Sequence, residues 1–331
     1  MSENVRMGIV GLGWWGDKLA NAIADSKGCE LASCYARTPS SRAAFAERHG
    51  CGQADSYNAL VTDPGVDAIF LVTPHSTHTD LIEHAAENGK HVFVEKPLTL
   101  TVAEGKRTLA AAESAGVVLQ VGHNRRRQAP NRRIKAMIDS GELGMVHLVQ
   151  GHICVPKDQV PRKGWRSDPD ESPVGGMTAL GVHMIDTFRY FVGPIERVFV
   201  MSKQLWAAGR TDDITVIALE FARGPLGELA TSIVLPKSTT TTVMGTSGIA
   251  WNEDDGERLY VQARDEPTRS EVPVEPVDTL VEEVQDFVHA ITQGERPETG
   301  GPEGLEVVAV LEAIMASDAT GEPMEVRDFR G

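Results

Sequence analysis

The chain has 331 residues and a formal net charge of −15 at pH 7. This length suggests two domains, and the composition is that of an ordinary globular protein. A diffusely acidic surface repels nucleic-acid phosphates and anionic membranes, so neither is expected as a partner. The four cysteines lack metal-ligand spacing, which predicts reduced thiols and no metal site. Without a secretory signal or a membrane-spanning apolar stretch in the sequence, we expect a cytoplasmic protein.

A glycine-rich motif follows the first predicted strand. Residues Val5–Val10 become continuously apolar, as a buried parallel strand does, and run into Gly11-Leu12-Gly13-Trp14-Trp15-Gly16 before a helical pattern. Gly11 permits the tight turn, Gly13 lets the backbone approach a pyrophosphate, and Gly16 lets the helix pack closely on the strand. The order strand, G-x-G-x-x-G, helix therefore predicts a dinucleotide site. The two aromatic residues within the motif are further candidate cofactor contacts: Trp14 and Trp15.

The second predicted strand, Glu30–Tyr35, lacks the acidic residue that an NAD site commonly places at the strand end. Arginine and hydroxyl side chains follow it instead, namely Arg37, Thr38 and Arg42. A guanidinium group binds a phosphate through two parallel hydrogen bonds, so this pattern favours NADP(H), with its 2′-phosphate, over NAD. The alternative is that Arg37 only stacks on the adenine or stays solvated, and that NAD is accepted.

A third strand should lead into the same site, because ligands of doubly wound sheets bind at the carboxyl ends of the strands. The predicted strand Val66–Val72 ends at Thr73 and Pro74, which we expect to line the cofactor. His78 follows, and two roles are open for it. It contacts the cofactor near the nicotinamide ribose, or it packs inside the predicted helix Thr77–Asn88.

The predicted strand His91–Val94 leads into Glu95, Lys96 and Pro97. A lysine at the rim of a parallel sheet is costly unless it has a function, so Lys96 is expected to lie beside the dinucleotide, with Glu95 in the same cofactor site. Glu95 either orients Lys96 or is a structural acid at the strand end. Short apolar strands alternate with amphipathic helices up to residue 121, which predicts an α/β domain with a doubly wound parallel sheet over residues 1–122.

The second half of the chain has a different pattern, with β-rich segments separated by turn residues. We predict an α+β domain over residues 123–331 with a large, mainly antiparallel sheet. Helices should cover one face of this sheet and leave the other open, and its apolar residues favour a subunit partner on the open face. The predicted strands are Val146–Ile153, Ile195–Lys203, Ile214–Phe221, Gly227–Leu235, Thr239–Thr246 and Arg258–Ala263.

Several motifs together resemble the Gfo/Idh/MocA oxidoreductases, the family of glucose-fructose oxidoreductase and inositol dehydrogenase. The resemblance spans essentially the whole chain. It implies an N-terminal Rossmann domain, a C-terminal substrate-binding domain with an open sheet, a bound NAD or NADP, and a homodimer or homotetramer formed through that sheet. The motifs are the N-terminal glycine motif, Glu95-Lys96-Pro97, Gly122-His123-Asn124-Arg125-Arg126, Gly164-Trp165-Arg166 and Gly181-Val182-His183-Met184-Ile185-Asp186.

The resemblance also implies a reaction and a catalytic pair. Family members mostly oxidise or reduce a secondary alcohol or carbonyl of a sugar, a cyclitol or a related small molecule. Lys96 and His183 match the pair that takes the hydroxyl proton and polarises the oxygen, and which of them is the base stays open. The resemblance also favours a cis bond between Lys96 and Pro97. One residue departs from the pattern: Ala179 stands where the family often has an aspartate that orients the histidine.

A further group of residues is predicted on the substrate side, together with His183. Trp165 can stack on the apolar face of a ring, and Arg166 can bind a carboxylate or hydroxyl groups. The alternative for Trp165 is a core position between the domains. Two arginines in this group leave room for an acidic substrate. The group comprises Asn124, Arg125, Trp165, Arg166 and Thr178.

Three hypotheses for function follow from these features. The first is an NAD(P)-dependent dehydrogenase or reductase that acts on a CH–OH group of a small sugar, cyclitol or related cyclic substrate. The second is a non-redox enzyme of the same fold, in which tightly bound NAD takes part in a cycle such as glycoside cleavage. The third is a cofactor-binding sensor without turnover, which the alanine at position 179 makes conceivable.

Overall fold

The computed structural model describes residues 4–156, 165, 168–206 and 212–331. The chain forms two compact units. The first unit comprises residues 1–123 and 278–308, and the second comprises residues 124–277 and 309–331. The sequence pattern groups residues 278–308 with the second half of the chain. Their return to the first unit could not be inferred, because the helical period does not indicate which sheet a helix packs on.

The first unit contains a six-stranded sheet in the order β3-β2-β1-β4-β5-β6, and every neighbouring pair is parallel. This confirms the predicted doubly wound parallel sheet. The apolar runs of β1, β4 and β5 are buried along nearly their whole length, because helices cover both faces of the sheet. The strands are β1 Val5–Val10, β2 Cys29–Tyr35, β3 Gly52–Gln53, β4 Ala68–Leu71, β5 His91–Glu95 and β6 Leu119–Gly122.

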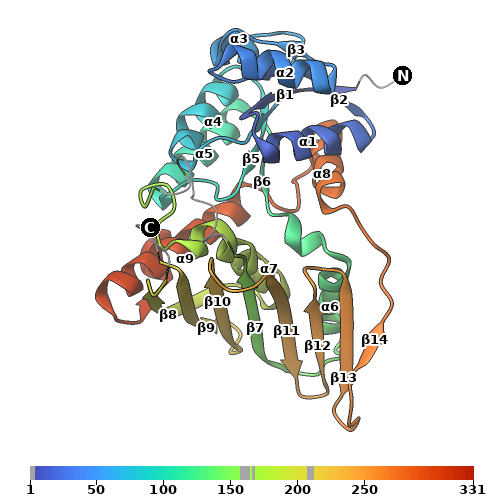
Figure 1. Ribbon diagram of the computed structural model, residues 1–331, viewed down its shortest axis with the longest axis vertical. Helices are drawn as coiled ribbons and strands as arrows, with labels where there is room; N and C mark the ends of the chain where they lie inside the picture. The colour runs from blue at the N-terminus through green and yellow to red at the C-terminus, as the bar shows by residue number, and fades with distance from the viewer. Residues whose placement is uncertain (1–3, 157–164, 166–167, 207–211) are drawn as a thin grey trace. The chain divides into compact units, whose positions relative to one another are not determined.

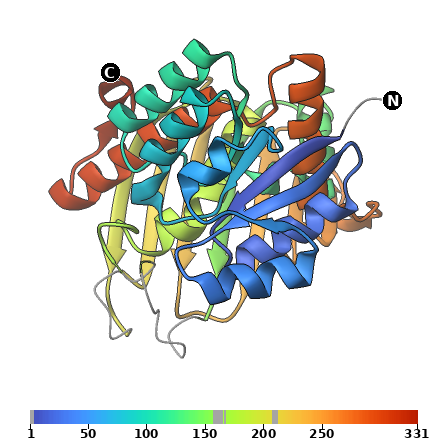
Figure 2. The ribbon, with the colours of Figure 1, turned by 90° about the horizontal axis from the view of Figure 1, so that it is seen from above.

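Aromatic packing fixes which helices lie on each face of this sheet. The rings of Phe70 on β4 and Phe93 on β5 stack with centroids 4.6 Å apart, and Phe287 of helix α8 meets both rings edge-on. These rings belong to one buried cluster with side chains of helices α1 and α2. In Figure 2 the blue helices α1 and α2 and the teal helices α4 and α5 lie on opposite sides of the sheet. The helices of this unit are α1 Trp14–Asp25, α2 Pro39–His49, α3 Tyr57–Val61, η1 His75–Thr77, α4 His78–Glu87, α5 Val102–Ala115 and α8 Thr279–Gln293.

The second unit contains a nine-stranded sheet in the order β14-β13-β12-β11-β7-β10-β9-β8-β15 (Figure 1). Only the pair of β10 and β7 is parallel, so the predicted mainly antiparallel sheet is confirmed. The sequence pattern missed β12, β14 and β15, and the last two are too short to show an alternation. The strands are β7 Val146–Cys154, β8 Ile195–Lys203, β9 Ile214–Phe221, β10 Leu226–Ser232, β11 Ser238–Gly245, β12 Gly248–Glu253, β13 Arg258–Ala263, β14 Ser270–Val272 and β15 Met324–Glu325.

Helices cover one face of this second sheet. Asn131 of α6 binds Asn252 of β12, Phe188 of α7 lies against Gly151 of β7, and Ser317 of α9 accepts a hydrogen bond from the backbone of β8. The opposite face carries no described helix and is therefore open. The helical segments are η2 Asn124–Arg127, α6 Ala129–Asp139, the π-helix η4 Met177–Gly181, α7 Val182–Val192, α9 Gly301–Thr320 and α10 Arg327–Arg330. Helix α9 starts in the first unit and continues into the second.

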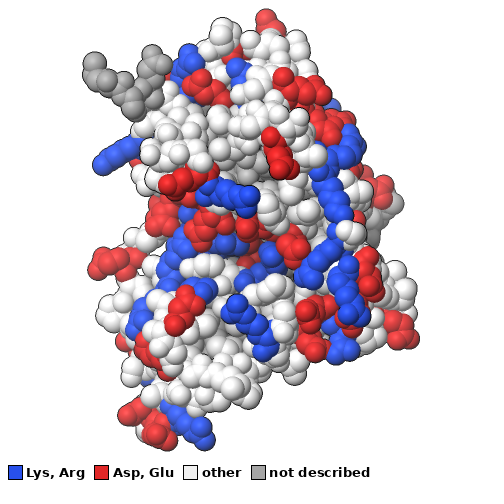
Figure 3. Space-filling view, turned by 180° about the vertical axis from the view of Figure 1, so that it is seen from behind, with Lys and Arg blue, Asp and Glu red and all other residues white. Residues whose placement is uncertain are grey.

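One face of the molecule is mixed in charge. Figure 3 shows acidic and basic side chains interspersed on the face that it displays, without a large patch of one sign. Within the described residues, no helix has both the length and the apolar character needed to cross a membrane. All four cysteines are free thiols.

Candidate active site

The loops at the carboxyl edge of the first sheet are held to one another by backbone contacts. The amide of Gly11, after β1, lies 3.4 Å from the carbonyl oxygen of Tyr35 at the end of β2. On its other side, Gly11 packs against the carbonyl group of Val72, after β4. Because β2, β1, β4 and β5 are neighbours, the loops after these four strands form one continuous edge.

The three motif glycines differ in the space around them. Gly11 has a φ of +98°, and a Cβ there would collide with the Val72 carbonyl group. A Cβ on Gly16 would collide with the carbonyl oxygen of Gly11, so this glycine is needed for close packing of α1. A Cβ on Gly13 would meet no heavy atom within 4 Å. The open space beside Gly13, at the N-terminus of a helix, fits the pyrophosphate of a dinucleotide.

The two tryptophans of the motif have different environments. Trp14 is 70% exposed, and the ammonium group of Lys18 lies 5.1 Å from its ring centre. Trp15 packs against the apolar core of the first unit. Its indole Nε1 is buried and has no hydrogen-bond partner among the described residues. Trp14 is therefore the one of the two that is accessible to a ligand.

Arg37 and Arg42, both predicted to contact the cofactor at the end of β2, have different environments. The Nη1 atom of Arg42 donates to the carbonyl oxygen of Ala36 at 2.9 Å, and its Nη2 lies 3.5 Å from Asp55. The Arg42 side chain is only 11% exposed, so it supports the tip from inside. Arg37 and Thr38 are exposed. This division leaves Arg37 as the arginine that can reach a ligand at the tip.

The strand β5 ends in the segment that carries the candidate catalytic lysine. The peptide bond between Lys96 and Pro97 is cis, which confirms the expectation from the family resemblance. Lys96 is half-buried, whereas Glu95 is buried with its carboxylate over Gly122 of the neighbouring strand. This position of Glu95 supports a structural role at the strand end.

The loop after β4 lies beside this segment. Thr73 and Pro74 are half-buried, and the hydroxyl group of Thr77 lies 2.8 Å from that of Thr73. His78, at the start of α4, is fully buried. Of the two roles that the sequence left open for His78, the buried position supports packing inside the unit.

In the second unit, His183 lies in the first turn of α7 and is 8% exposed. Asp186, one turn further along, forms a buried ion pair with Arg126 of η2, with 2.9 Å between Arg126 Nε and Asp186 Oδ2. The Arg126 guanidinium also lies 5.3 Å from the ring centre of Tyr190 on the same helix. These contacts fix the helix that carries His183 to the segment containing Asn124 and the arginines.

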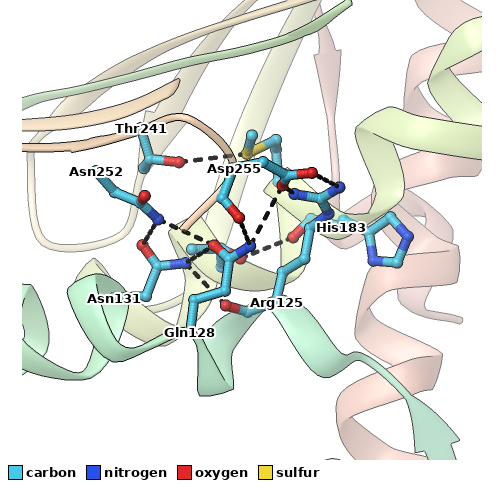
Figure 4. A network of polar contacts seen from close by, with 9 residues as sticks. Arg125, Gln128, Asn131, His183, Thr241, Asn252 and Asp255 are labelled. Carbon is cyan, nitrogen blue, oxygen red and sulfur yellow. Dashed lines mark hydrogen bonds and ion pairs between the residues drawn. The ribbon is translucent and has the colours of Figure 1, made fainter. Parts of the chain in front are cut away.

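Figure 4 shows a polar network around Arg125. Arg125 forms an ion pair with Asp255 in the turn between β12 and β13. Gln128 Nε2 donates to the backbone carbonyl of Asp255 at 2.8 Å, and Asn252 donates to both Gln128 and Asn131. The side chains of Arg125 and Asp255 are 17% and 29% exposed. The charge of Arg125 is therefore balanced within the second unit.

The segment before α7 contains the remaining candidates. Thr178 lies buried in the π-helix and donates to the carbonyl oxygen of Pro173, while Ala179 occupies the position where a carboxylate was expected. Asn124 and Trp165 are half-buried. Arg166 lies outside the described residues. The π-helix itself was not predicted, because a single widened turn leaves the apolar period almost unchanged.

Sequence reasoning missed Asp255, and it left Asp186 and Arg126 without an assigned interaction. The partner of Arg125 is 130 positions away in the chain. A turn signal was available at residues 253–257, where Asp254, Asp255 and Gly256 all have positive φ. Within the described residues, no group of three or more His, Cys, Asp or Glu side chains forms a possible metal site.

Two family models match the chain. Residues 5–123 match the model described as the oxidoreductase family with an NAD-binding Rossmann fold. Residues 131–251 match the model described as the GFO/IDH/MocA C-terminal domain. The two matches fall largely on the first unit and the second unit, respectively.

Individual proteins are similar over most of the chain. The scyllo-inositol 2-dehydrogenase (NAD(+)) of Bacillus subtilis strain 168 is 32% identical, and the match covers 75% of this chain and 73% of that protein. The 1,5-anhydro-D-fructose reductase of Ensifer adhaerens is 26% identical, over 97% of this chain and 98% of that protein. A crystal structure from Desulfitobacterium hafniense DCB-2, provisionally described as an NADPH-dependent oxidoreductase, has a TM-score of 0.95 at 29% identity and covers 100% of both chains.

Proposed function

The chain belongs to the GFO/IDH/MocA oxidoreductase family, and from this premise we propose that it transfers a hydride between a nicotinamide dinucleotide and the CH–OH group of a small neutral sugar or cyclitol. The observation that carries the proposal is the continuous edge formed by the loops after β2, β1, β4 and β5. It combines an open glycine loop with a lysine at the end of β5. The relatives named as an inositol dehydrogenase and an anhydrofructose reductase support this substrate class.

The bound nicotinamide supplies the acceptor or donor of the hydride. The open backbone at Gly13 and the N-terminus of α1 would hold the pyrophosphate, while Gly11 and Gly16 shape the turn that presents them. Lys96 and His183 act on the reacting oxygen: one removes the hydroxyl proton, and the other stabilises the negative charge that develops there. Because Ala179 replaces the aspartate that often orients this histidine, the orientation of His183 depends on the position of α7. The Arg126–Asp186 pair fixes that position.

One observation favours a neutral substrate over an acidic one. Arg125 is paired with Asp255, so it does not present an unbalanced positive charge to a carboxylate. The Arg125 guanidinium can still donate hydrogen bonds to hydroxyl groups, because it has five N–H donors and the ion pair occupies only part of them. Asn124, Trp165 and Thr178 complete the proposed substrate contacts, together with Arg166.

We also propose NADP(H) as the preferred cofactor. The relatives include both an NAD(+)-dependent enzyme and a protein described as NADPH-dependent, so the local residues have to decide. The tip of β2 presents the exposed Arg37 and Thr38 and lacks an acidic residue for the ribose hydroxyls. Arg42 supports the carbonyl group of Ala36 and thereby the conformation of the tip.

A second copy of the chain is the proposed partner for the open face of the second sheet, giving a homodimer or a homotetramer. Strand pairing places Met201, Val216, Ala230, His152 and Thr240 in one row across five strands. Met201 is 60% exposed. A depression of about 520 Å³ on the same face is lined by residues of β7, β10 and β11 and the turn between β10 and β11. Exposed apolar residues on such a face commonly mark an association surface.

Free thiols and an acidic net charge agree with a cytoplasmic location.

The proposal is tested by replacing Lys96 with alanine. Reduced nicotinamide formation with a panel of neutral sugars, cyclitols and sugar acids should fall by at least about 10³-fold for Lys96→Ala, a loss typical of a catalytic acid–base group. Dinucleotide binding, followed by energy transfer from tryptophan to the reduced nicotinamide, should weaken by no more than about tenfold and so remain measurable. Lys27→Ala, at an exposed position before β2 of the same sheet, is the control. Retained turnover in Lys96→Ala would contradict the assignment, and reduction followed by reoxidation of the cofactor without net change would support the non-redox alternative.

The cofactor preference is tested at Arg37. Replacement of Arg37 by alanine removes the accessible guanidinium, so KM for NADP should rise about tenfold or more while KM for NAD changes little. Arg48→Ala, on the neighbouring helix α2, is a matched control. A wild-type KM for NAD well below that for NADP would refute the preference directly.

A further inference from the structure

His78 bridges two loops at the carboxyl edge of the first sheet. Its Nδ1 lies 3.1 Å from the carbonyl oxygen of Pro97 and 3.2 Å from that of Leu98, in the segment that follows Lys96. Its Nε2 lies 3.2 Å from the carbonyl oxygen of Thr73, in the loop after β4. The His78 side chain is fully buried, and of its three contacts only the one to half-buried Thr73 is partly accessible to solvent.

All three of these partner atoms are carbonyl oxygens, which accept hydrogen bonds and cannot donate them. A neutral imidazole has one N–H, so its second nitrogen would direct a lone pair at a carbonyl oxygen within hydrogen-bonding distance. Only the protonated ring donates from both nitrogens. We propose that His78 is a cationic positioning residue: as an imidazolium it ties the Thr73 loop to the segment that carries Lys96, and so holds Lys96 against the dinucleotide.

Burial of a cation has a cost, which these contacts must offset. Hydrogen bonds from a charged donor are stronger than neutral ones, and the two N–H groups of the ring face three acceptors at 3.1–3.2 Å, two of which share Nδ1. The positive end of α4 opposes a charge on its first residue, which makes the three acceptors necessary.

Other titratable groups on the surrounding elements influence the same ring. The ring of His75 in η1 lies 5.7 Å from it, centre to centre, in an edge-on contact. The buried Glu95 ends β5, just before Lys96. Asp80, Glu83 and His84 lie on α4 itself, and Glu104 caps the start of α5. Two adjacent buried cations repel each other. A protonated His78 therefore requires a neutral His75 over the pH range in which His78 ties the two loops together.

The inference rests on the proposed function for the role of Lys96, but its central claim concerns protonation and can be measured without turnover. Nitrogen-15 NMR of histidine-labelled protein reports whether each ring nitrogen carries a proton. The His78 signal, assigned by its loss in His78→Gln, should show two protonated nitrogens at neutral pH in the unmodified protein. A His78 signal with a single protonated nitrogen overturns the proposal.

The effect of His78 protonation on the cofactor site is measured as the dissociation constant of the dinucleotide at a series of pH values. In the unmodified protein, the dissociation constant should rise about tenfold as pH increases through the deprotonation of His78. That rise should be absent in His78→Gln and present in His84→Gln, which alters an exposed histidine of the same helix. A pH profile unchanged by His78→Gln would refute the positioning role. Because dinucleotide binding needs no substrate, this outcome is separate from any failure to find turnover.

Discussion

Two adjacent arginines, Arg125 and Arg126, have different partners and therefore different functions. Arg126 is buried and paired with Asp186, so it sets the position of the helix that carries His183. Arg125 is less deeply placed and is paired with Asp255 of a hairpin turn. An ion pair that is partly accessible can exchange partners more readily than a buried one, because water can replace the lost contacts. At the residue scale, Arg125 is thus the arginine whose charge the surroundings can tune.

This difference predicts the effect of removing the carboxylate that balances Arg125. In Asp255→Asn the Arg125 charge becomes available, and kcat/KM for carboxylated sugars should rise about tenfold relative to neutral ones, equivalent to ~1.4 kcal/mol. Asparagine suits the site because Asp255 has a φ of 62°, a conformation that asparagine tolerates. Steady-state kinetics with neutral and acidic substrate pairs measure the ratio. Glu257→Gln removes one negative charge at an exposed position nearby and should leave the ratio of kcat/KM for acidic and neutral substrates unchanged. An equal shift of this ratio in both variants would refute the specific effect of Asp255 on Arg125.

At the element scale, the strand–turn–helix unit formed by β1 and α1 contains some glycines that the fold needs and one that only a ligand would need. Gly11 and Gly16 are required by the protein's own backbone, because a side chain would collide with carbonyl groups of the fold. Gly13 faces open space in the protein and is required only if a ligand approaches. The same motif therefore contains residues with structural and with binding functions.

The contrast predicts opposite outcomes for two alanine substitutions. Gly11→Ala should lower the free energy of unfolding by about 2–4 kcal/mol, from backbone strain at φ +98° and overpacking against Val72. Gly13→Ala should change it by less than about 1 kcal/mol, the usual range for an alanine at a helix N-cap, yet raise the dinucleotide dissociation constant about tenfold or more. Urea unfolding and fluorescence titration measure the two quantities. Wild-type affinity in Gly13→Ala would show that the pyrophosphate does not approach this glycine.

At the scale of the whole molecule, the second sheet presents one covered and one open face. The covered face packs against α6, α7 and α9, and the open face carries rows of side chains that run across many strands. One such row contains Phe199, Ala218, Glu228, Gln150, Thr242, Trp251 and Tyr260. A face of this extent with apolar residues at its edge is suited to a symmetric contact, in which the same surface is used by both copies.

A charge within the proposed contact should separate the copies. Met201→Glu places a carboxylate in the row with Val216 and Ala230, so the mass measured by light scattering after size exclusion should fall from that of an oligomer to that of one chain. Val277→Glu, at an exposed apolar position outside the sheet, should keep the mass of the unmodified protein. A monomeric unmodified protein would refute the proposed interface.

Much of the fold was predictable because its signals are local. The parallel strands of the first unit show as continuous apolar runs, and the antiparallel strands of the second show as alternating ones. Short strands such as β14 and β15 were not predictable, since two or three residues carry no period. The return of α8 to the first unit was not predictable either. It depends on Phe287 meeting Phe70 and Phe93, a contact between residues far apart in the chain.

The sequence by itself determined the dinucleotide loop and the lysine at the end of β5, because backbone conformation and residue spacing are local properties. It also pointed to His183 through its motif. Only the tertiary structure decided which candidate residues form ion pairs or hydrogen bonds with other groups of the protein. Asp255 holds Arg125, Ala36 holds Arg42, and three carbonyl oxygens enclose His78. The Arg125–Asp255 pair joins residues 130 positions apart and follows from the packing of the second unit. The contacts of Arg42 and His78 are closer in sequence, but they depend on how the loops after β2, β4 and β5 fold back.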